Sequence, residues 1–315
     1  MSKPACDEKT FVELFEKYGA SEAARRLNMS ERIIYRRRNV LEKKLRRSIN
    51  SPVREHAHRP IVEHPHRATL DIEYGIVLVG SDAHYWPGPA TTAHRAFVKF
   101  CKDMKPAAVV LNGDVMDFPQ ISRHPPIGWE SQPTVQQEME AAQERLSEIE
   151  SATFRAQKIW TLGNHDGRFE TRLATAAPEF AKIAGVHLKD HFPNWRPAWS
   201  CWINDDVVIK HRHKNGVHAT HNSTLWAGRT TITGHLHSAK VTPFTDYNGT
   251  RYGVDTGCLA NPDARSFVDY TEDNPKNWRS AFGVLTFHKG RLLMPELCLV
   301  FDPSHVQFRG RVIEV

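Results

Sequence analysis

No stretch of the 315-residue sequence approaches the run of roughly 18 apolar residues that a membrane helix needs. The first nine residues have no apolar core, so we expect no secretory signal. Cysteine is scarce, and the five cysteines lie far apart without a C-x-x-C pair. This pattern is typical of free thiols in a reducing cytoplasm and excludes a disulfide framework or a thiolate zinc site. Hydrophobic residues make up 40% of the chain, which predicts a packed core and excludes global disorder.

The excess of positive charge is confined to one end of the chain. Residues 1–48 contain 13 Lys/Arg and 7 Asp/Glu, a net of +6 that equals the net charge of the whole chain. The rest of the chain therefore contains 29 basic and 29 acidic residues. Within the first segment, residues 25–48 alone have a net charge of +8. A surface that binds polyanions is predicted there, and the remainder has to be interpreted on other grounds.

Helical patterns fill this basic segment. Apolar residues at helical spacing from Phe11 to Tyr18 predict a helix that ends at Gly19. A second helix is predicted over residues 21–27, and a third begins after Ser30, which is placed as its N-cap. Two short helices joined by a tight turn are typical of a helix-turn-helix.

The stretch GASEAARRLNMSERIIYRRR resembles the helix-turn-helix of Fis-like and resolvase-like DNA-binding proteins. It departs from that pattern at Asn28, where glycine is usual in the turn, and at Arg38, where an apolar residue commonly closes the core. The resemblance and the charge together predict binding to DNA or RNA. The candidate contacts are Arg32, Arg36, Arg37 and Arg38. The alternative is a solvated basic helix or an arm that contacts other proteins.

Residues 49–69 contain three prolines and no apolar periodicity, which predicts an extended linker between an N-terminal domain (1–48) and a larger domain (70–315). In the larger domain, strands and helices alternate in the order β-α-β-α-β, which predicts a parallel sheet. Its strands are expected at 76–80, 107–111 and 159–162, and its helices at 93–104 and 135–149. Further strands, expected to form a second sheet packed on the first, are at 207–210, 230–233, 241–245, 252–255, 283–287 and 292–300.

Polar residues that no core would select follow five of these strands. They are Asp82 and His84, then Asp114 and Asp117, then Asn164, His165 and Asp166, then His211 and His213, and finally His235 and His237. Because functional groups collect at the carboxyl ends of strands in α/β sheets, we expect these side chains to meet in one crevice. Imidazole and carboxylate without thiolate suit Mn, Fe, Zn, Co or Ni. The ligands are too many for one tetrahedral ion and match two ions about 3.5–4 Å apart.

The motifs D-x-H, G-D-x-x-D, G-N-H-D, a strand-end His and G-H-x-H occur in this order between residues 76 and 240 and resemble the calcineurin-like metallophosphoesterase superfamily. The resemblance implies an α/β fold of two packed mixed β-sheets flanked by helices, with two divalent ions, Mn²⁺ being favoured. It implies one ion held by Asp82, His84, Asp114 and His237, and a second held by Asp114, Asn164, His211 and His235. His213 stays open as an alternative to His211.

The same resemblance predicts hydrolysis of a phosphate ester. Two divalent ions lower the pKa of a bridging water, so that hydroxide attacks the phosphorus in line with the leaving oxygen. His165 is expected to protonate that oxygen, with Asp166 orienting its imidazole. Asp117 either holds a ligand histidine or caps a helix. Candidate contacts to substrate phosphates, with surface or capping roles as the alternative, are Arg123, His124 and Arg168.

Together these features predict a cytoplasmic, metal-dependent phosphoesterase that hydrolyses phosphodiester bonds in DNA. A small DNA-binding module ahead of such a domain is similar to proteins encoded by phages. One alternative is a phosphomonoesterase or nucleotide phosphodiesterase with a DNA-binding arm. Another is a non-enzymatic DNA-binding protein with a scaffold domain, which would have damaged metal ligands, and none of the motifs is damaged. The sequence identifies no protein partner and predicts no membrane contact.

Overall fold

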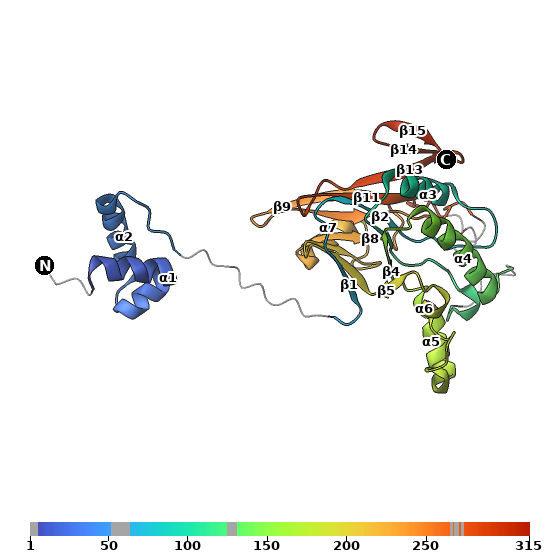
Figure 1. Ribbon diagram of the computed structural model, residues 1–315, viewed down its shortest axis with the longest axis horizontal. Helices are drawn as coiled ribbons and strands as arrows, with labels where there is room; N and C mark the ends of the chain where they lie inside the picture. The colour runs from blue at the N-terminus through green and yellow to red at the C-terminus, as the bar shows by residue number, and fades with distance from the viewer. Residues whose placement is uncertain (1–5, 52–63, 125–130, 265–266, 268–270, 272–273) are drawn as a thin grey trace. The chain divides into compact units, whose positions relative to one another are not determined.

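The computed structural model of the chain describes residues 6–51, 64–124, 131–264, 267, 271 and 274–315. The chain divides into two compact units, Met1–Glu63 and His64–Val315, and each has its own apolar core (Figure 1). Most of the predicted linker lies outside the described residues. Its last residues, however, belong to the second unit, because Arg67–Leu70 forms a strand there. None of the helices that the structure describes is long and apolar enough to cross a membrane.

The first unit consists of helices α1 (Glu8–Leu27) and α2 (Glu31–Leu45). Gly19, the predicted end of the first helix, breaks α1 with a φ of 76° and a ψ of 178°. Asn28 connects the helices in the left-handed conformation, with a φ of 52°, which asparagine tolerates without glycine. Ser30 takes the predicted N-cap position of α2 with extended dihedral angles but without a side-chain cap hydrogen bond. The sequence therefore predicted three helical segments and both breaks between them.

The core of this unit is formed by side chains from both helices. The buried residues are Phe11, Val12, Phe15, Ala20, Ala23, Ala24, Ile34, Leu41 and Ile49. The small residues Ala23 and Ala24 allow close packing in the second half of α1, as their pattern predicted. Burying a side chain the size of Phe or Ile contributes about 1.5–3 kcal/mol. Four large side chains, Phe11, Phe15, Ile34 and Ile49, are fully buried and hold the unit together.

The second unit is built on two mixed sheets. The larger has the order β15-β14-β13-β11-β2-β3-β4-β5, with β12 paired to β11, and its parallel part is β2, β3, β4 and β5. Its strands are β2 (Gly75–Gly80), β3 (Ala108–Leu111), β4 (Gln157–Thr161), β5 (Arg196–Ala198), β11 (Ala281–His288), β12 (Arg291–Leu292), β13 (Glu296–Asp302), β14 (His305–Phe308) and β15 (Arg311–Glu314).

The smaller sheet has the order β1-β6-β7-β8-β10-β9, in which β6/β7 and β9/β10 are antiparallel and the other neighbours are parallel. Its strands are β1 (Arg67–Leu70), β6 (Ser200–Ile203), β7 (Val207–Ile209), β8 (Thr230–Thr233), β9 (Lys240–Asp246) and β10 (Gly249–Asp255). The helical segments of the unit are α3 (Thr92–Met104), η1 (Pro119–Ile121), α4 (Val135–Ala152), α5 (Gly167–Ala176), η2 (Pro178–Phe180), α6 (Leu188–His191) and α7 (Ala219–Ala227).

The side chains of β2 alternate between the two faces of the larger sheet, and this alternation shows how the layers pack. Val77 and Val79 belong to a buried cluster that also contains Ile209 of β7 and Ile232 of β8, so this face packs on the smaller sheet. Leu78 points the other way, into a cluster with side chains of α3 and α4. The central strand is thus buried on both faces, which explains its continuous apolar run. The predicted fold class, two packed mixed sheets flanked by helices, is confirmed (Figure 1).

The sequence placed the C-terminal strands in the wrong sheet. The hairpin predicted around Lys289 and Gly290 forms, but its strand β11 pairs antiparallel with β2 and extends the larger sheet. The single strand predicted over 292–300 is split into β12 and β13, because Pro295 between them cannot donate to the ladder. The second sheet contains the predicted strands β7, β8, β9 and β10, and it is completed by β1 and β6, which were not predicted.

Candidate metal centre

The loops that follow β2, β3, β7 and β8 are joined to one another by backbone hydrogen bonds. After β2, the Asp82 N–H donates to the Gly113 carbonyl (2.9 Å) and the His84 N–H donates to the Asp114 carbonyl (3.0 Å). After β8, the Gly234 N–H donates to the His211 carbonyl (2.9 Å). The His235 N–H in turn donates to Asp82 Oδ2 (2.8 Å). Side chains from four strand ends are therefore fixed around one point.

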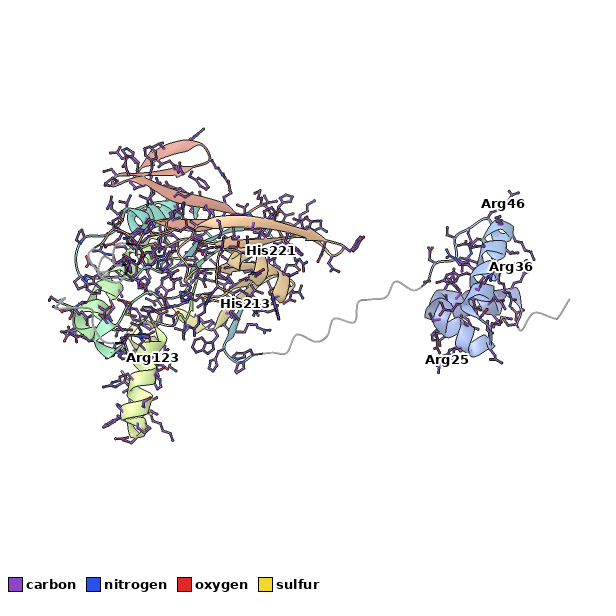
Figure 2. The ribbon with its side chains drawn as sticks, turned by 180° about the vertical axis from the view of Figure 1, so that it is seen from behind. Arg25, Arg36, Arg46, Arg123, His213 and His221 are labelled. Carbon is purple, nitrogen blue, oxygen red and sulfur yellow. The ribbon has the colours of Figure 1, made fainter. Side chains whose placement is uncertain are left out.

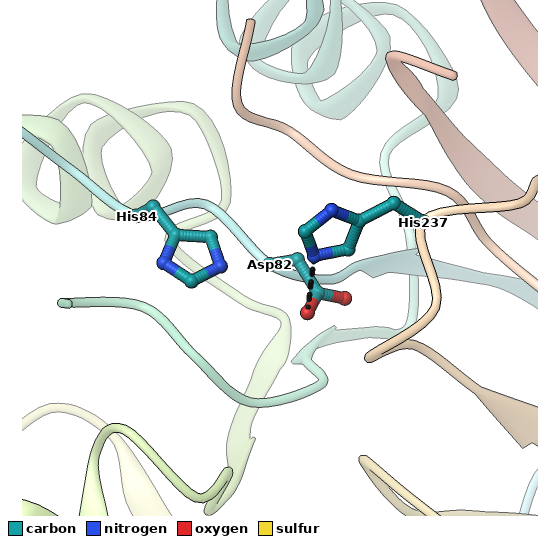
Figure 3. A group of neighbouring side chains, drawn as sticks. All are labelled: Asp82, His84 and His237. Atoms are coloured by element: carbon teal, nitrogen blue, oxygen red, sulfur yellow. Dashed lines mark hydrogen bonds and ion pairs between the residues drawn. The ribbon is translucent and has the colours of Figure 1, made fainter. Parts of the chain in front are cut away.

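Six of the predicted ligands fall into two groups of three. The first group is Asp82, His84 and His237, and the second is Asp114, His211 and His235; the candidate ligand atoms within each group lie within 4.8 Å of one another. Figure 3 shows the first group, in which His237 Nε2 lies 3.0 Å from Asp82 Oδ1. In the second group His211 Nε2 lies 3.0 Å from Asp114 Oδ2. The two groups adjoin, because the same His211 nitrogen is 4.0 Å from Asp82 Oδ1.

The backbone at this centre is strained. Five of the ligands have a left-handed φ that residues other than glycine adopt rarely: Asp82 (52°), His84 (41°), Asp114 (50°), His235 (69°) and His237 (54°). Each such residue costs of order 1 kcal/mol or more, and residues of this kind gather at functional sites. The fold therefore holds these side chains in conformations that packing alone would not select.

Several buried polar atoms of the centre have no hydrogen-bond partner in the structure. They are both ring nitrogens of His84, Nδ1 of His237 and Oδ1 of Asn164. Buried polar atoms are normally paired, because an unpaired one costs about 1–3 kcal/mol. Imidazole nitrogens and carboxylate oxygens that converge in one buried place, several of them without a hydrogen-bond partner, are the donor set of a divalent transition metal. The residues present thus fit bound metal ions.

Glycines allow the loops to approach the carboxylates closely. A Cβ atom at Gly163 would lie 2.1 Å from Asp114 Oδ1, and one at Gly234 would lie 2.3 Å from Asp82 Oδ2. No side chain fits at either position. Asn164 follows Gly163 directly and lines the same cavity as His211.

The charges of the centre stabilise one another. Burial alone would raise the pKa of Asp82, but His237 and His211 outweigh it and lower that pKa. Burial likewise opposes ionisation of Asp114, whose pKa is nevertheless lowered, chiefly by His211. Burial would lower the pKa of His211, but Asp82 and Asp114 raise it to about 10. The carboxylates are therefore ionised at neutral pH and attract cations.

His165 lies at the edge of the centre. Its Nδ1 pairs with Asp117 Oδ1, and its Nε2 is 3.7 Å from Asp114 Oδ2. Burial would lower the pKa of His165, but Asp117 and Asp114 raise it. Arg168 donates to the Asp117 carbonyl (2.7 Å) and fixes the same loop. One imidazole nitrogen is thus anchored while the other faces the ligands.

Asp166 was predicted to orient the imidazole of His165, but its carboxylate has other partners. Its buried carboxylate accepts hydrogen bonds from the Gly163 N–H (2.8 Å), the Asp114 N–H (2.9 Å) and Trp160 Nε1 (2.9 Å). It therefore ties the loops after β3 and β4 together, and the carboxylate that holds His165 is Asp117. The reason is that Asp166 begins α5 and points back beneath the loop, a direction that the motif does not reveal.

Asp117 is the residue whose role the sequence left open. Besides His165, it lies near His84, with 3.6 Å between Oδ1 and His84 Nδ1. The helical segment η1 that follows has Phe118 at its N-cap position. Of the two alternatives after β7, His211 is buried in the second group, while His213 belongs to neither group. Arg123, His124 and Arg168 all line one cavity beside the centre.

The four arginines of the first unit differ in their surroundings. Arg37 donates to the Cys6 carbonyl (2.5 Å) and stacks on Phe11, with 4.7 Å from its guanidinium carbon to the ring centre. Arg38 pairs with Glu42 (2.9 Å) and partly closes the core, where an apolar residue is usual. Arg32 and Arg36 are exposed, and Arg36 is labelled at the surface of this unit in Figure 2. These two remain available to a ligand.

Comparisons with known proteins give two phage relatives and a set of solved structures. No family model matches the chain. The Gene 54 protein of Mycobacterium phage D29 is 28% identical over 234 residues, which cover 64% of this chain and 85% of that protein. The Gene 54 protein of Mycobacterium phage L5 is 25% identical over 252 residues, covering 70% and 92%.

Two solved structures are examples from the comparison with known structures. A single mutant of Vps29 from Entamoeba histolytica superposes with a TM-score of 0.41 at 14% identity, over 76% of this chain and 99% of that one. Yfce, a phosphoesterase from E. coli, gives a TM-score of 0.33 at 13% identity, over 73% and 90%.

Proposed function

We propose that the second unit is a metal-dependent phosphoesterase of the calcineurin-like type and that it hydrolyses phosphodiester bonds in DNA. One observation carries the proposal: two adjoining groups of buried histidine and aspartate, with unpartnered ring nitrogens, meet where parallel strands end. A structural role would leave such polar atoms paired, as in most protein interiors.

The residues divide naturally between two ions. Asp82, His84 and His237 would hold one ion, and His211, His235 and Asn164 would hold the other, with Asp114 between them. When bound, divalent ions such as Mn²⁺ make a water molecule sufficiently acidic to attack an esterified phosphorus and neutralise charge on its oxygens.

The other side chains handle the proton of the leaving group. His165 is held at Nδ1 by Asp117, and the neighbouring carboxylates of Asp117 and Asp114 raise the pKa of its imidazole. In the doubly protonated ring that this favours, the proton on Nε2 can pass to the departing oxygen. Asp117 is a positioning residue, since it acts through His165. Arg168 fixes the carbonyl of Asp117 and limits movement of this pair.

The first unit supports nucleic acid as the substrate. Its residues 25–48 have a net charge of +8, and its exposed Arg32 and Arg36 lie one turn apart on α2. Such a surface attracts phosphates regardless of sequence and would keep the catalytic unit close to a DNA strand.

Hydrolysis of bis-p-nitrophenyl phosphate with added Mn²⁺ tests the enzyme proposal. We expect turnover by the full chain and a fall of at least about 100-fold in Asp114→Asn, the scale of losing one preorganised stabilising group. The matched control is Asp103→Asn, an exposed carboxylate on α3 remote from the centre, which should retain full activity. Undiminished turnover in Asp114→Asn would refute the proposal, and p-nitrophenyl phosphate as the better substrate would favour a phosphomonoesterase.

A further inference from the structure

A cavity of about 790 Å³ opens directly beside the second group of ligands. Asn164 and His211 form part of its wall, so it is continuous with the proposed metal centre. Its other walls come from α5, from the segment after η1, from the residue between β5 and β6, and from the loop after β7. A volume of this order is typical of a ligand site.

The lining of this cavity carries charge of one sign. Five of its side chains are basic: Arg123, Arg168, Arg172, Lys210 and Arg212. No aspartate or glutamate is among the described residues that line it. Arg123, Arg172 and Arg212 are exposed, and the described part of the chain provides none of them with a carboxylate partner. Arg123 lies beside α5, as Figure 2 shows. Cations that gather without counter-charges indicate an anionic ligand.

The spacing of these cations indicates more than one phosphate. Arg168 and Arg172 are four residues apart on α5, a rise of about 6 Å along one face of the helix. Arg168 lies next to His165, where the reacting phosphate would bind, and Arg172 lies one turn further along α5. Arg212 follows His211 directly and lines the same cavity from the loop after β7. None of the side chains of α5 is fully buried, so this helix contributes little to the core and is free to serve as a wall.

Trp199 supplies a flat apolar surface in the same cavity. It stands between β5 and β6 with half of its side chain exposed (50%), while its backbone N–H is fixed by the His66 carbonyl (2.8 Å). A base stacked on an aromatic side chain contributes binding without regard to sequence, and only an unpaired base has a free face. A groove that pairs cations with an exposed ring is typical of proteins that bind single strands.

We propose that this cavity is a binding subsite for single-stranded nucleic acid, with the strand's phosphates on Arg172 and Arg212 and a base on Trp199. The inference rests on the proposed function for the reaction that follows binding. It adds the form of the substrate: a strand that extends beyond the scissile phosphate, rather than a mononucleotide or an intact duplex. A mononucleotide would leave the outer cations without partners, and a duplex offers no free base face inside the strand.

Photo-cross-linking of the full chain in EDTA tests the subsite without any turnover. A short single-stranded DNA that contains 5-bromodeoxyuridine is irradiated with the protein, and cross-linked peptides are identified by mass spectrometry. We expect cross-links at Trp199, reduced at least about tenfold in the double variant Arg172→Ala/Arg212→Ala. The matched control is Arg291→Ala/Arg311→Ala, two exposed arginines on the far strands β12 and β15, which should cross-link as the unmodified chain does.

The outcomes separate this inference from the proposed function. No cross-link at Trp199, an equal yield from the annealed duplex, or no effect of Arg172→Ala/Arg212→Ala would each overturn the subsite. Hydrolysis of bis-p-nitrophenyl phosphate is measured on the same preparations. Hydrolysis without a cross-link at Trp199 overturns the subsite alone, whereas a cross-link without hydrolysis upholds the subsite and overturns the proposed function. Cross-links confined to residues 1–48 assign strand binding to the first unit and also overturn the subsite.

Discussion

The two units use charged residues in opposite ways. In the first unit, Arg32 and Arg36 stand in solvent, where salt screens them and any polyanion can approach. In the second, Asp82, Asp114 and His211 are buried, and His211 and the two carboxylates stabilise each other's charges. A buried charge is costly without a partner, so it is kept only where the fold supplies one or a bound ion does. Surface charge thus predicts a class of ligand, while buried charge predicts a defined chemical site.

Replacing the proposed proton donor should have the largest effect in this comparison. In His165→Gln, turnover should fall about 10²–10⁴-fold for esters with poor leaving groups, because the departing oxygen is no longer protonated. Esters with good leaving groups should be much less affected. The measurement is kcat across a series of substituted phenyl phosphodiesters. A uniform loss across the series would contradict the donor role and leave His165 with a purely structural one.

The next largest effect is expected for Asp117, which acts through His165. Asp117→Asn should lower kcat about 10–100-fold while metal content stays near normal, because the imidazole loses its anchor but the two ligand groups remain. Elemental analysis and kinetics on the same sample test this. Asp166→Asn provides the contrast: it should reduce folding stability and metal content together, since its carboxylate holds the loop backbone. If Asp166→Asn lowered kcat alone, and Asp117→Asn lowered stability and metal content together, the sequence-based assignment of Asp166 as the residue that orients His165 would be correct.

The exposed charges of the first unit should give a smaller, salt-dependent effect. Arg32→Ala/Arg36→Ala should weaken binding to duplex DNA, and the slope of log K against log salt should become shallower by about 0.9 for each phosphate that the protein no longer neutralises. Hydrolysis of small esters should not change. Arg37→Ala should instead lower the Tm, because Arg37 packs on Phe11. An unchanged salt slope in the double variant would show that this face does not bind the phosphates.

The smallest expected effect is on the pH dependence of the Tm, and it comes from a buried carboxyl. Glu138 of α4 is fully buried, and burial raises its pKa to about 8. A carboxyl with a raised folded-state pKa stabilises the fold below its ordinary pKa of 4.5, and that contribution is lost as the pH rises through about 8. The Tm of Glu138→Gln should therefore exceed that of the unmodified chain above pH 8 by a few degrees, since about 1 kcal/mol shifts it by roughly 2–4 °C. Parallel Tm curves from pH 5 to 9 would contradict this.

The sequence predicted the part of the fold that positions the site because that part carries the strongest local signals. β2 and β3 are buried on both faces and so appear as short, continuous apolar runs. Pairing between strands that are far apart in the chain leaves no such local signal in the sequence. β1, β5 and β6 are three or four residues long, and the placement of β11 beside β2 depends on contacts some 200 residues apart. Neither could be inferred from periodicity.

The same contrast applies within the site. The convergence of the candidate metal ligands could be predicted because each follows a strand, whose direction fixes where the side chain emerges. Asp117 takes the part expected of Asp166, and Asp166 instead holds loop backbone. Both lie on loops, and loop direction is set by hydrogen bonds to groups elsewhere, such as those from the Gly163 and Asp114 N–H groups to Asp166. Of the basic cavity on α5, only Arg123, His124 and Arg168 were named from the sequence, as separate candidates. Arg172 and Arg212 were not named, because the fold alone brings them to this cavity.

Anomalous diffraction from a crystal soaked in Mn²⁺ tests the central claim most directly. The account predicts two manganese peaks about 3.5–4 Å apart, one at Asp82, His84 and His237 and the other at His211 and His235, with Asp114 in contact with both. A map with no manganese at these side chains, at a concentration that saturates the protein in solution, would contradict it.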